Sequence, residues 1–124
     1  MARYMAHALA VVVAVFFIAG CGVAENASYC PFSGSLVASE EPGTITELHT
    51  ATVKALNNLE LRITYNKKDN LVAVVEAMTA QGNAIKVLID FRSVDVSYLV
   101  VDTEKEKYKA AGVLNEIRKN MSAI

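Results

Sequence analysis

Four strand-like segments in close succession constrain the fold of this chain more than any other feature. They cover residues 61–66, 71–80, 85–92 and 97–101, with only a few residues between them. In the first and third segments apolar residues recur at every second position, as in a strand with one buried face. Connections this short join antiparallel neighbours, because a parallel pair needs a long crossover. The sequence therefore predicts an antiparallel meander.

Amphipathic helices are predicted on both sides of this meander. Thr44 and Glu47 have the spacing of a capping box, which satisfies exposed amides at a helix start, and Thr103 and Glu106 repeat it. After each pair, apolar residues recur every three or four positions, which places them on one face of a helix. The stripes consist of Ile45, Leu48, Thr52, Ala55, Leu56 and Leu59 in the first helix, and of Ala110, Leu114, Ile117, Met121 and Ile124 in the second.

A further short strand is predicted in residues 33–39, before Glu40-Glu41-Pro42-Gly43 breaks the chain. The expected order is then β-α-β-β-β-β-α, within a single domain over residues 33–124. Apolar faces of this kind are buried most simply in a two-layer α+β sandwich. We expect an antiparallel sheet of four to five strands with two helices packed on one face.

Residues 1–20 have the pattern of a lipoprotein signal peptide. A basic residue precedes an apolar run from Ala8 to Ile18, which is shorter than the roughly 20 residues that span a bilayer. The run ends in Ile18-Ala19-Gly20-Cys21, which reads as a lipobox. We therefore predict cleavage between Gly20 and Cys21, and lipidation of Cys21.

Residues 21–32 are then the lipidated cysteine and a flexible spacer. Gly22, rather than aspartate, follows the cysteine, which by analogy with Gram-negative bacteria favours the periplasmic side of the outer membrane. Two alternatives stay open. An ordinary signal peptide cleaved near Ala24 would remove Cys21 or leave it to pair with Cys30, and an uncleaved segment would be an N-terminal anchor.

Charge argues against one class of partner. After the predicted cleavage, thirteen acidic and eleven basic residues remain, and the basic residues form no cluster. Nucleic-acid-binding proteins carry clustered positive charge. We therefore expect no nucleic-acid partner, but a membrane reached through the lipid anchor and an envelope protein.

Glu76 is the one acidic residue in an otherwise apolar segment. If Gly82 and Asn83 form a two-residue turn, Glu76 shares the buried face with Met78 and Phe91. These three residues are the candidate lining of a ligand cavity between helices and sheet. A bulge or register slip that turns Glu76 outward is the alternative.

No catalytic or metal-binding pattern accompanies these residues. His49 is the only histidine after the signal peptide, and one histidine with a distant Cys30 completes neither a metal site nor an acid–base pair. The sequence predicts no catalytic residue, no metal site and no cofactor, and an enzyme using Glu76 or His49 ranks last among the hypotheses.

The chain resembles an uncharacterised family of small bacterial lipoproteins, a domain of unknown function, over residues 33–121. Cys30 and the longer spacer depart from the family pattern, and the family supplies no catalytic residues to transfer. The resemblance implies an envelope location and an α+β domain. It is carried by Ile18-Ala19-Gly20-Cys21, Gly34-Ser35-Leu36, Ala51, Ala55-Leu56, Leu59-Glu60-Leu61, Thr79-Ala80-Gln81-Gly82-Asn83 and the strand from Ile85 to Phe91.

These features predict a membrane-anchored envelope lipoprotein whose domain is a non-enzymatic docking or assembly module. The alternative function is a carrier that holds a small apolar ligand or lipid between the helices and the sheet.

Overall fold

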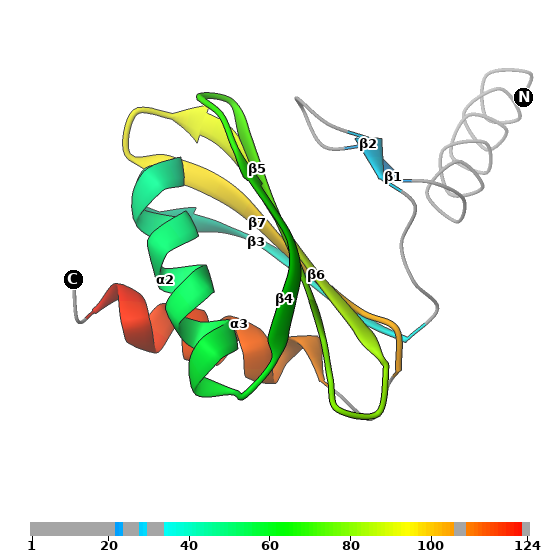
Figure 1. The fold of residues 1–124 in the computed structure, drawn as a ribbon. Helices are drawn as coiled ribbons and strands as arrows, with labels where there is room; N and C mark the ends of the chain where they lie inside the picture. Colours follow the sequence, from blue (N-terminus) through cyan, green and yellow to red (C-terminus); the bar gives the residue numbers. More distant parts are fainter. Residues whose placement is uncertain (1–21, 24–27, 30–33, 106–108, 123–124) are drawn as a thin grey trace, which may run out of the picture.

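The computed structural model describes residues 22–23, 28–29, 34–105 and 109–122 (Figure 1). Two short strands, β1 (Gly22–Val23) and β2 (Ser28–Tyr29), pair with each other. The remaining elements form the domain. They are β3 (Ser35–Pro42), α2 (Ile45–Asn58), β4 (Arg62–Lys68), β5 (Val72–Met78), β6 (Ala84–Ser93), β7 (Val96–Thr103) and α3 (Ala110–Met121).

The domain is a two-layer α+β sandwich, which confirms the predicted fold class. The five strands are antiparallel in the order β3-β7-β6-β5-β4, so the first strand pairs with the last. Both helices lie on one face of the sheet (Figure 1). There α2 packs on β4, β5 and β6, while α3 packs on β3 and β7 and also against α2.

Large aliphatic side chains from α2, from α3 and from the sheet fill the space between the helices and the sheet. Small residues on the same faces, such as Ala55 of α2 and Ala77 of β5, are fully buried and allow close approach. Burying one large aliphatic side chain contributes about 1.5–3 kcal/mol. The fully buried side chains of this cluster include Leu48, Leu56, Val75, Ile85, Val87, Ile89, Leu99, Val101 and Ile117.

Helix α2 begins directly after Thr44, the capping residue that the sequence predicted. The Glu47 amide donates to Thr44 Oγ1 at 3.1 Å, and the Thr44 amide donates to Glu47 Oε1 at 3.1 Å. This reciprocal pair is the capping box, which confirms the sequence prediction.

The second helix does not begin at Thr103, and Glu106, the other residue of the second predicted capping box, lies outside the described residues. Thr103 is the last residue of β7, and its hydroxyl accepts a hydrogen bond from the Ser35 amide and donates one to the Ser35 carbonyl, both at 3.2 Å. The helix instead begins at Ala110, whose amide donates to Ser35 Oγ at 3.1 Å. The prediction was wrong because strand pairing to β3, distant in sequence, holds Thr103 in the sheet.

The first strand is also longer than predicted. It runs through Glu40 and Glu41 to Pro42, where the sequence predicted a break. Because β3 lies at the edge of the sheet, a proline at its end is tolerated. The longer strand places Ser39 and Glu41 on the same face as Val37, which packs against the core under α3.

Candidate functional site

Glu76 and Met78 do not face the helices as the two-residue turn predicted, and the alternative, a register that turns Glu76 outward, is confirmed. The last pair of the β5–β6 hairpin is Met78 with Ala84, so residues 79–83 form a five-residue loop rather than a two-residue turn. The resulting register differs from the predicted one by an odd number of residues, which moves side chains to the opposite face. Both residues lie on the face away from the helices, and the Glu76 carboxylate lies 3.7 Å from Lys86 Nζ.

Phe91 is on the helix side of β6, as predicted with Ile85, Val87 and Ile89, but beyond the edge of the core. Its relative exposure is 37%, and it lines a separate hollow at the end of the sheet. Glu76, Met78 and Phe91 therefore do not line one cavity. The space between helices and sheet where they were predicted to meet is occupied by buried side chains.

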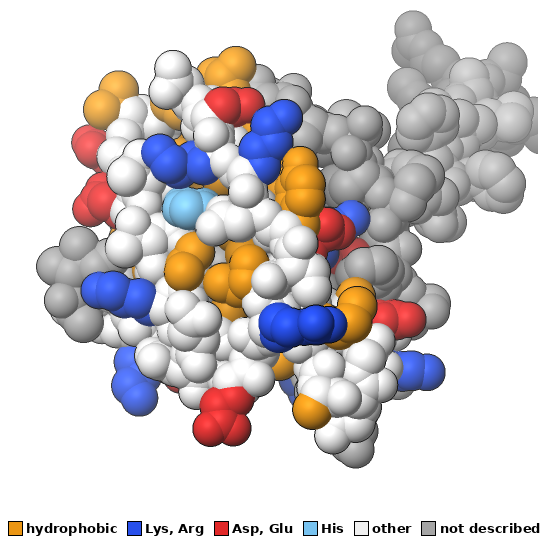
Figure 2. All heavy atoms as spheres, in the orientation of Figure 1, with side chains coloured by type: hydrophobic (Ala, Val, Ile, Leu, Met, Phe, Trp, Pro, Cys, Tyr) orange, Lys and Arg blue, Asp and Glu red, His pale blue; other side chains and the backbone are white. Residues whose placement is uncertain are grey.

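His49 lies at the surface between α2 and β4 (pale blue in Figure 2). Its Nε2 atom is 2.6 Å from Asn66 Oδ1, so this side chain links the helix to the edge strand. Among the described residues no group of three histidine, cysteine or acidic side chains could hold a metal ion.

Gly20 and Cys21, at which cleavage and lipidation are predicted, lie outside the described residues, as does Cys30. Cleavage and lipidation therefore stay predictions. None of the described helices combines the length and apolar character needed to cross a bilayer.

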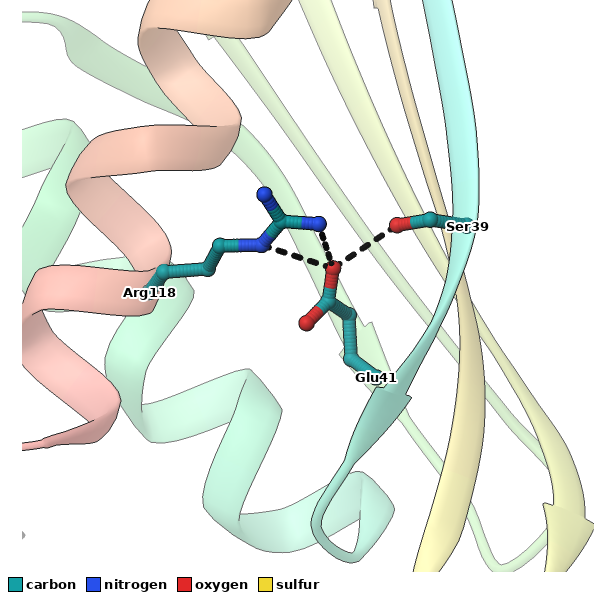
Figure 3. Close-up of polar contacts among 3 residues, drawn as sticks. All are labelled: Ser39, Glu41 and Arg118. Carbon is teal, nitrogen blue, oxygen red and sulfur yellow. Dashed lines mark hydrogen bonds and ion pairs between the residues drawn. The ribbon is translucent and has the colours of Figure 1, made fainter.

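The structure brings together one polar cluster that the sequence did not predict (Figure 3). Glu41 of β3 is 7% exposed, and its Oε1 atom accepts three hydrogen bonds. They come from Ser39 Oγ at 2.7 Å, from Arg118 Nε at 2.9 Å and from Arg118 Nη2 at 2.6 Å. Since Ala110 also binds Ser35, β3 holds α3 near both of its ends.

Burial alone would raise the pKa of Glu41. The hydrogen bonds from Arg118 and Ser39 and the positive charge of Arg118 outweigh it, so the pKa lies below the ordinary value of 4.5. The carboxylate is therefore ionised at neutral pH. In turn, the hydrogen bond to Glu41 raises the pKa of Arg118.

A cleft of about 580 Å³ opens beside this ion pair, between the end of β3, the first turn of α2 and the end of α3. Gly43 forms part of its wall with φ near +133°, and a Cβ there would lie 2.7 Å from Met121 Cε. The positive φ favours glycine at this position, while the flexible end of the Met121 side chain could move away from a Cβ. The cleft is lined by Glu41, Pro42, Gly43, Glu47, Arg118, Met121 and Ser122.

A second feature is an exposed apolar end of the domain, which we call the tip and define as Leu71, Phe91 and Val94. Their relative exposures are 52%, 37% and 78%. The Phe91 amide donates to the Leu71 carbonyl at 2.9 Å, which places these two residues side by side. Figure 2 shows hydrophobic side chains at the surface at this end.

Phe91 and Val94 border a hollow of about 290 Å³ whose apolar floor includes Ile45. Its rim is polar and consists of Thr44, Thr46, Asp69, Asn70 and Ser93. Apolar residues around a hollow with a polar rim are typical of a surface that accepts a partner side chain.

The sequence contained a signal for the Glu41 cluster. Val37, Ser39 and Glu41 continue one period-two alternation, and following it past residue 39 would have placed Glu41 on the helix face. Nothing local in the sequence pairs Glu41 with Arg118, which lies 77 residues away.

Comparison of the chain with models of known protein families and with curated proteins finds no match. The resemblance to small bacterial lipoproteins stays a prediction.

Proposed function

We propose that this protein is a bacterial envelope lipoprotein, anchored through Cys21 on the periplasmic side of the outer membrane, whose domain docks a partner protein. Support for the anchor comes from the sequence Ile18-Ala19-Gly20-Cys21 and the spacer behind it. Two acyl chains or more hold a protein stably on a bilayer, and a lipoprotein cysteine carries that many.

The position of the tip carries the docking proposal. Ser35 pairs with Thr103 at one end of the sheet, and Pro42 pairs with Val96 at the other end, next to Val94. At roughly 3.3 Å per residue, the eight residues of β3 separate these ends by about 23 Å. The β6–β7 hairpin, which carries Phe91 and Val94, therefore lies at the end of the sheet opposite the start of β3 (Figure 1).

The anchor is tested by the intact mass of the protein purified from its native host. We expect a chain that begins at Cys21 and carries a diacylglyceryl group with a further acyl group. In a Cys21→Ser variant this added mass should be absent and the protein should leave the membrane fraction. A wild-type chain with Cys21 unmodified, or in a disulfide, would contradict the proposal.

Docking is tested with a photo-crosslinking amino acid at Val94 in cells. We expect a discrete adduct, and a second substitution, Leu71→Asp, should lower its yield at least tenfold because it puts a charge at the centre of the apolar contact. Exposed substitutions of this kind change stability by only about 0.5 kcal/mol.

The matched control is Leu36→Asp, which changes a leucine of similar exposure (47%) on β3, remote from the tip. It should leave the adduct unchanged. The docking proposal fails if no adduct forms, or if Leu36→Asp and Leu71→Asp reduce its yield equally.

A further inference from the structure

We propose that the cleft beside Glu41 binds an organic cation, an alkyl ammonium or guanidinium group, on the carboxylates of Glu41 and Glu47. This site is separate from the tip, and neither proposal depends on the other.

The hydrogen bonds of Glu41 leave one oxygen for a ligand. All three donors from Ser39 and Arg118 go to Oε1, and Oε2 accepts no hydrogen bond from a described residue. Figure 3 shows Oε2 pointing away from both partners. Glu41 is 7% exposed and lines the cleft, so a donor at Oε2 would have to enter from there. An ionised carboxylate oxygen accepts a stronger hydrogen bond from a charged donor than from a neutral one.

The charges around the cleft favour a cation over an anion. Among the described residues, its lining contains two carboxylates, Glu41 and Glu47, and one guanidinium, that of Arg118. One oxygen of Glu47 accepts the Thr44 amide at 3.1 Å, and the other accepts no hydrogen bond from a described residue. An anionic ligand would face both carboxylates, while an ammonium group brings a positive charge and three N–H donors.

The remaining walls suit the alkyl part of such a ligand. Pro42 and Met121 contribute apolar surface, the first from the end of β3 and the second from the last turn of α3. A volume of about 580 Å³ is within the range of small-molecule sites. A chain of several carbons with a terminal ammonium group therefore matches both the shape and the charge of the cleft.

The test is an NMR titration of the ¹⁵N-labelled protein with n-pentylamine, 1,5-diaminopentane, 1-pentanol and pentanoate, all at pH 7. We expect saturable shifts of the Gly43 and Ser122 amides with the two amines. Pentanol and pentanoate should bind at least tenfold more weakly. A capped lysine, N-acetyl-lysine methylamide, distinguishes the source of the cation: binding as tight as pentylamine supports a partner's side chain, and binding of the free amines alone supports a small metabolite.

Two variants locate the site. Glu41→Gln should weaken amine binding at least tenfold and Glu47→Gln about threefold. Glutamine also serves at the third position of a capping box, so Glu47→Gln keeps the fold even if Glu41→Gln does not. Glu40→Gln is the matched control, because Glu40 is exposed and pairs with Tyr98 on the other face of the sheet.

The proposal is overturned if no amine gives saturable shifts at tens of millimolar, or if pentanoate binds as tightly as pentylamine. It is also overturned if Glu47→Gln binds amines like the wild type.

Discussion

The variant Ala77→Glu should lose about 4 kcal/mol of folding free energy or fail to fold. Ala77 is 0% exposed, and on β5 it faces the helices together with Ala73 and Val75. A glutamate there would overfill the contact with the helix layer and place a carboxylate in the core without a partner. Urea unfolding followed by circular dichroism measures the loss.

The control is Glu76→Ala, one residue earlier on the same strand. The Glu76 side chain is 36% exposed, and its 3.7 Å ion pair with Lys86 is a surface contact, worth less than about 1 kcal/mol. This variant should stay within about 1 kcal/mol of the wild type. If Ala77→Glu were the milder of the two changes, Ala77 would face solvent and Glu76 the helices, as the register predicted from the sequence requires.

Replacing Arg118 with methionine should destabilise the domain by about 2 kcal/mol at pH 7. The substitution removes two hydrogen bonds and the positive charge from Glu41, whose carboxylate stays buried against β3. Breaking a fully buried ion pair costs about 3–5 kcal/mol, and the cost here is lower because the Arg118 side chain is 50% exposed.

The cost of Arg118→Met should depend on pH. In the wild type the pKa of Glu41 is lowered, so the stability contributed by its ionisation is present above 4.5 and is lost as the pH falls through the folded-state pKa. In the variant burial remains while the Arg118 contacts are gone, and the pKa of Glu41 should rise. The difference between the two proteins should therefore be largest at neutral pH and should shrink in acid.

Unfolding curves of both proteins between pH 3 and pH 7 measure this difference. Lys119→Met is the matched control, because Lys119 is the neighbouring basic residue in the last turn of α3 and Glu41 takes its hydrogen bonds from Arg118 instead. Its effect should be small and independent of pH. If the difference in unfolding free energy between wild type and Arg118→Met were constant over this range, Arg118 would not lower the pKa of Glu41.

Both predictions concern places where reasoning from the sequence failed, and the failures have different causes. On β5 apolar residues lie on both faces, with Val72, Val74 and Met78 outside and Ala73, Val75 and Ala77 inside. In such a segment the pattern of apolar and polar residues does not indicate which face of the strand is buried. The choice follows from the five-residue loop at residues 79–83 and from the close packing of the helix layer on small side chains.

The candidate site was missed because its partners are far apart in the chain. Ser39 ends the predicted strand and Glu41 falls in the predicted break Glu-Glu-Pro-Gly, while Arg118 lies outside the apolar stripe from which the second helix was predicted. The site exists only once β3 extends to Pro42 and α3 packs against it. The tip was likewise not predicted, since Leu71, 20 residues before Phe91, lies beside it only through the backbone hydrogen bond between the two residues.

The sequence by itself determined the elements and their class. Capping at Thr44, the amphipathic stripes and the short connections act over a few residues, so they predict two helices and an antiparallel sheet without knowledge of distant contacts. Tertiary structure alone decided which face of β5 is buried, where β3 and β7 end, and which charges meet at Glu41. Those outcomes depend on packing and hydrogen bonds between residues as many as 77 positions apart, and local patterns carry no information about such pairs.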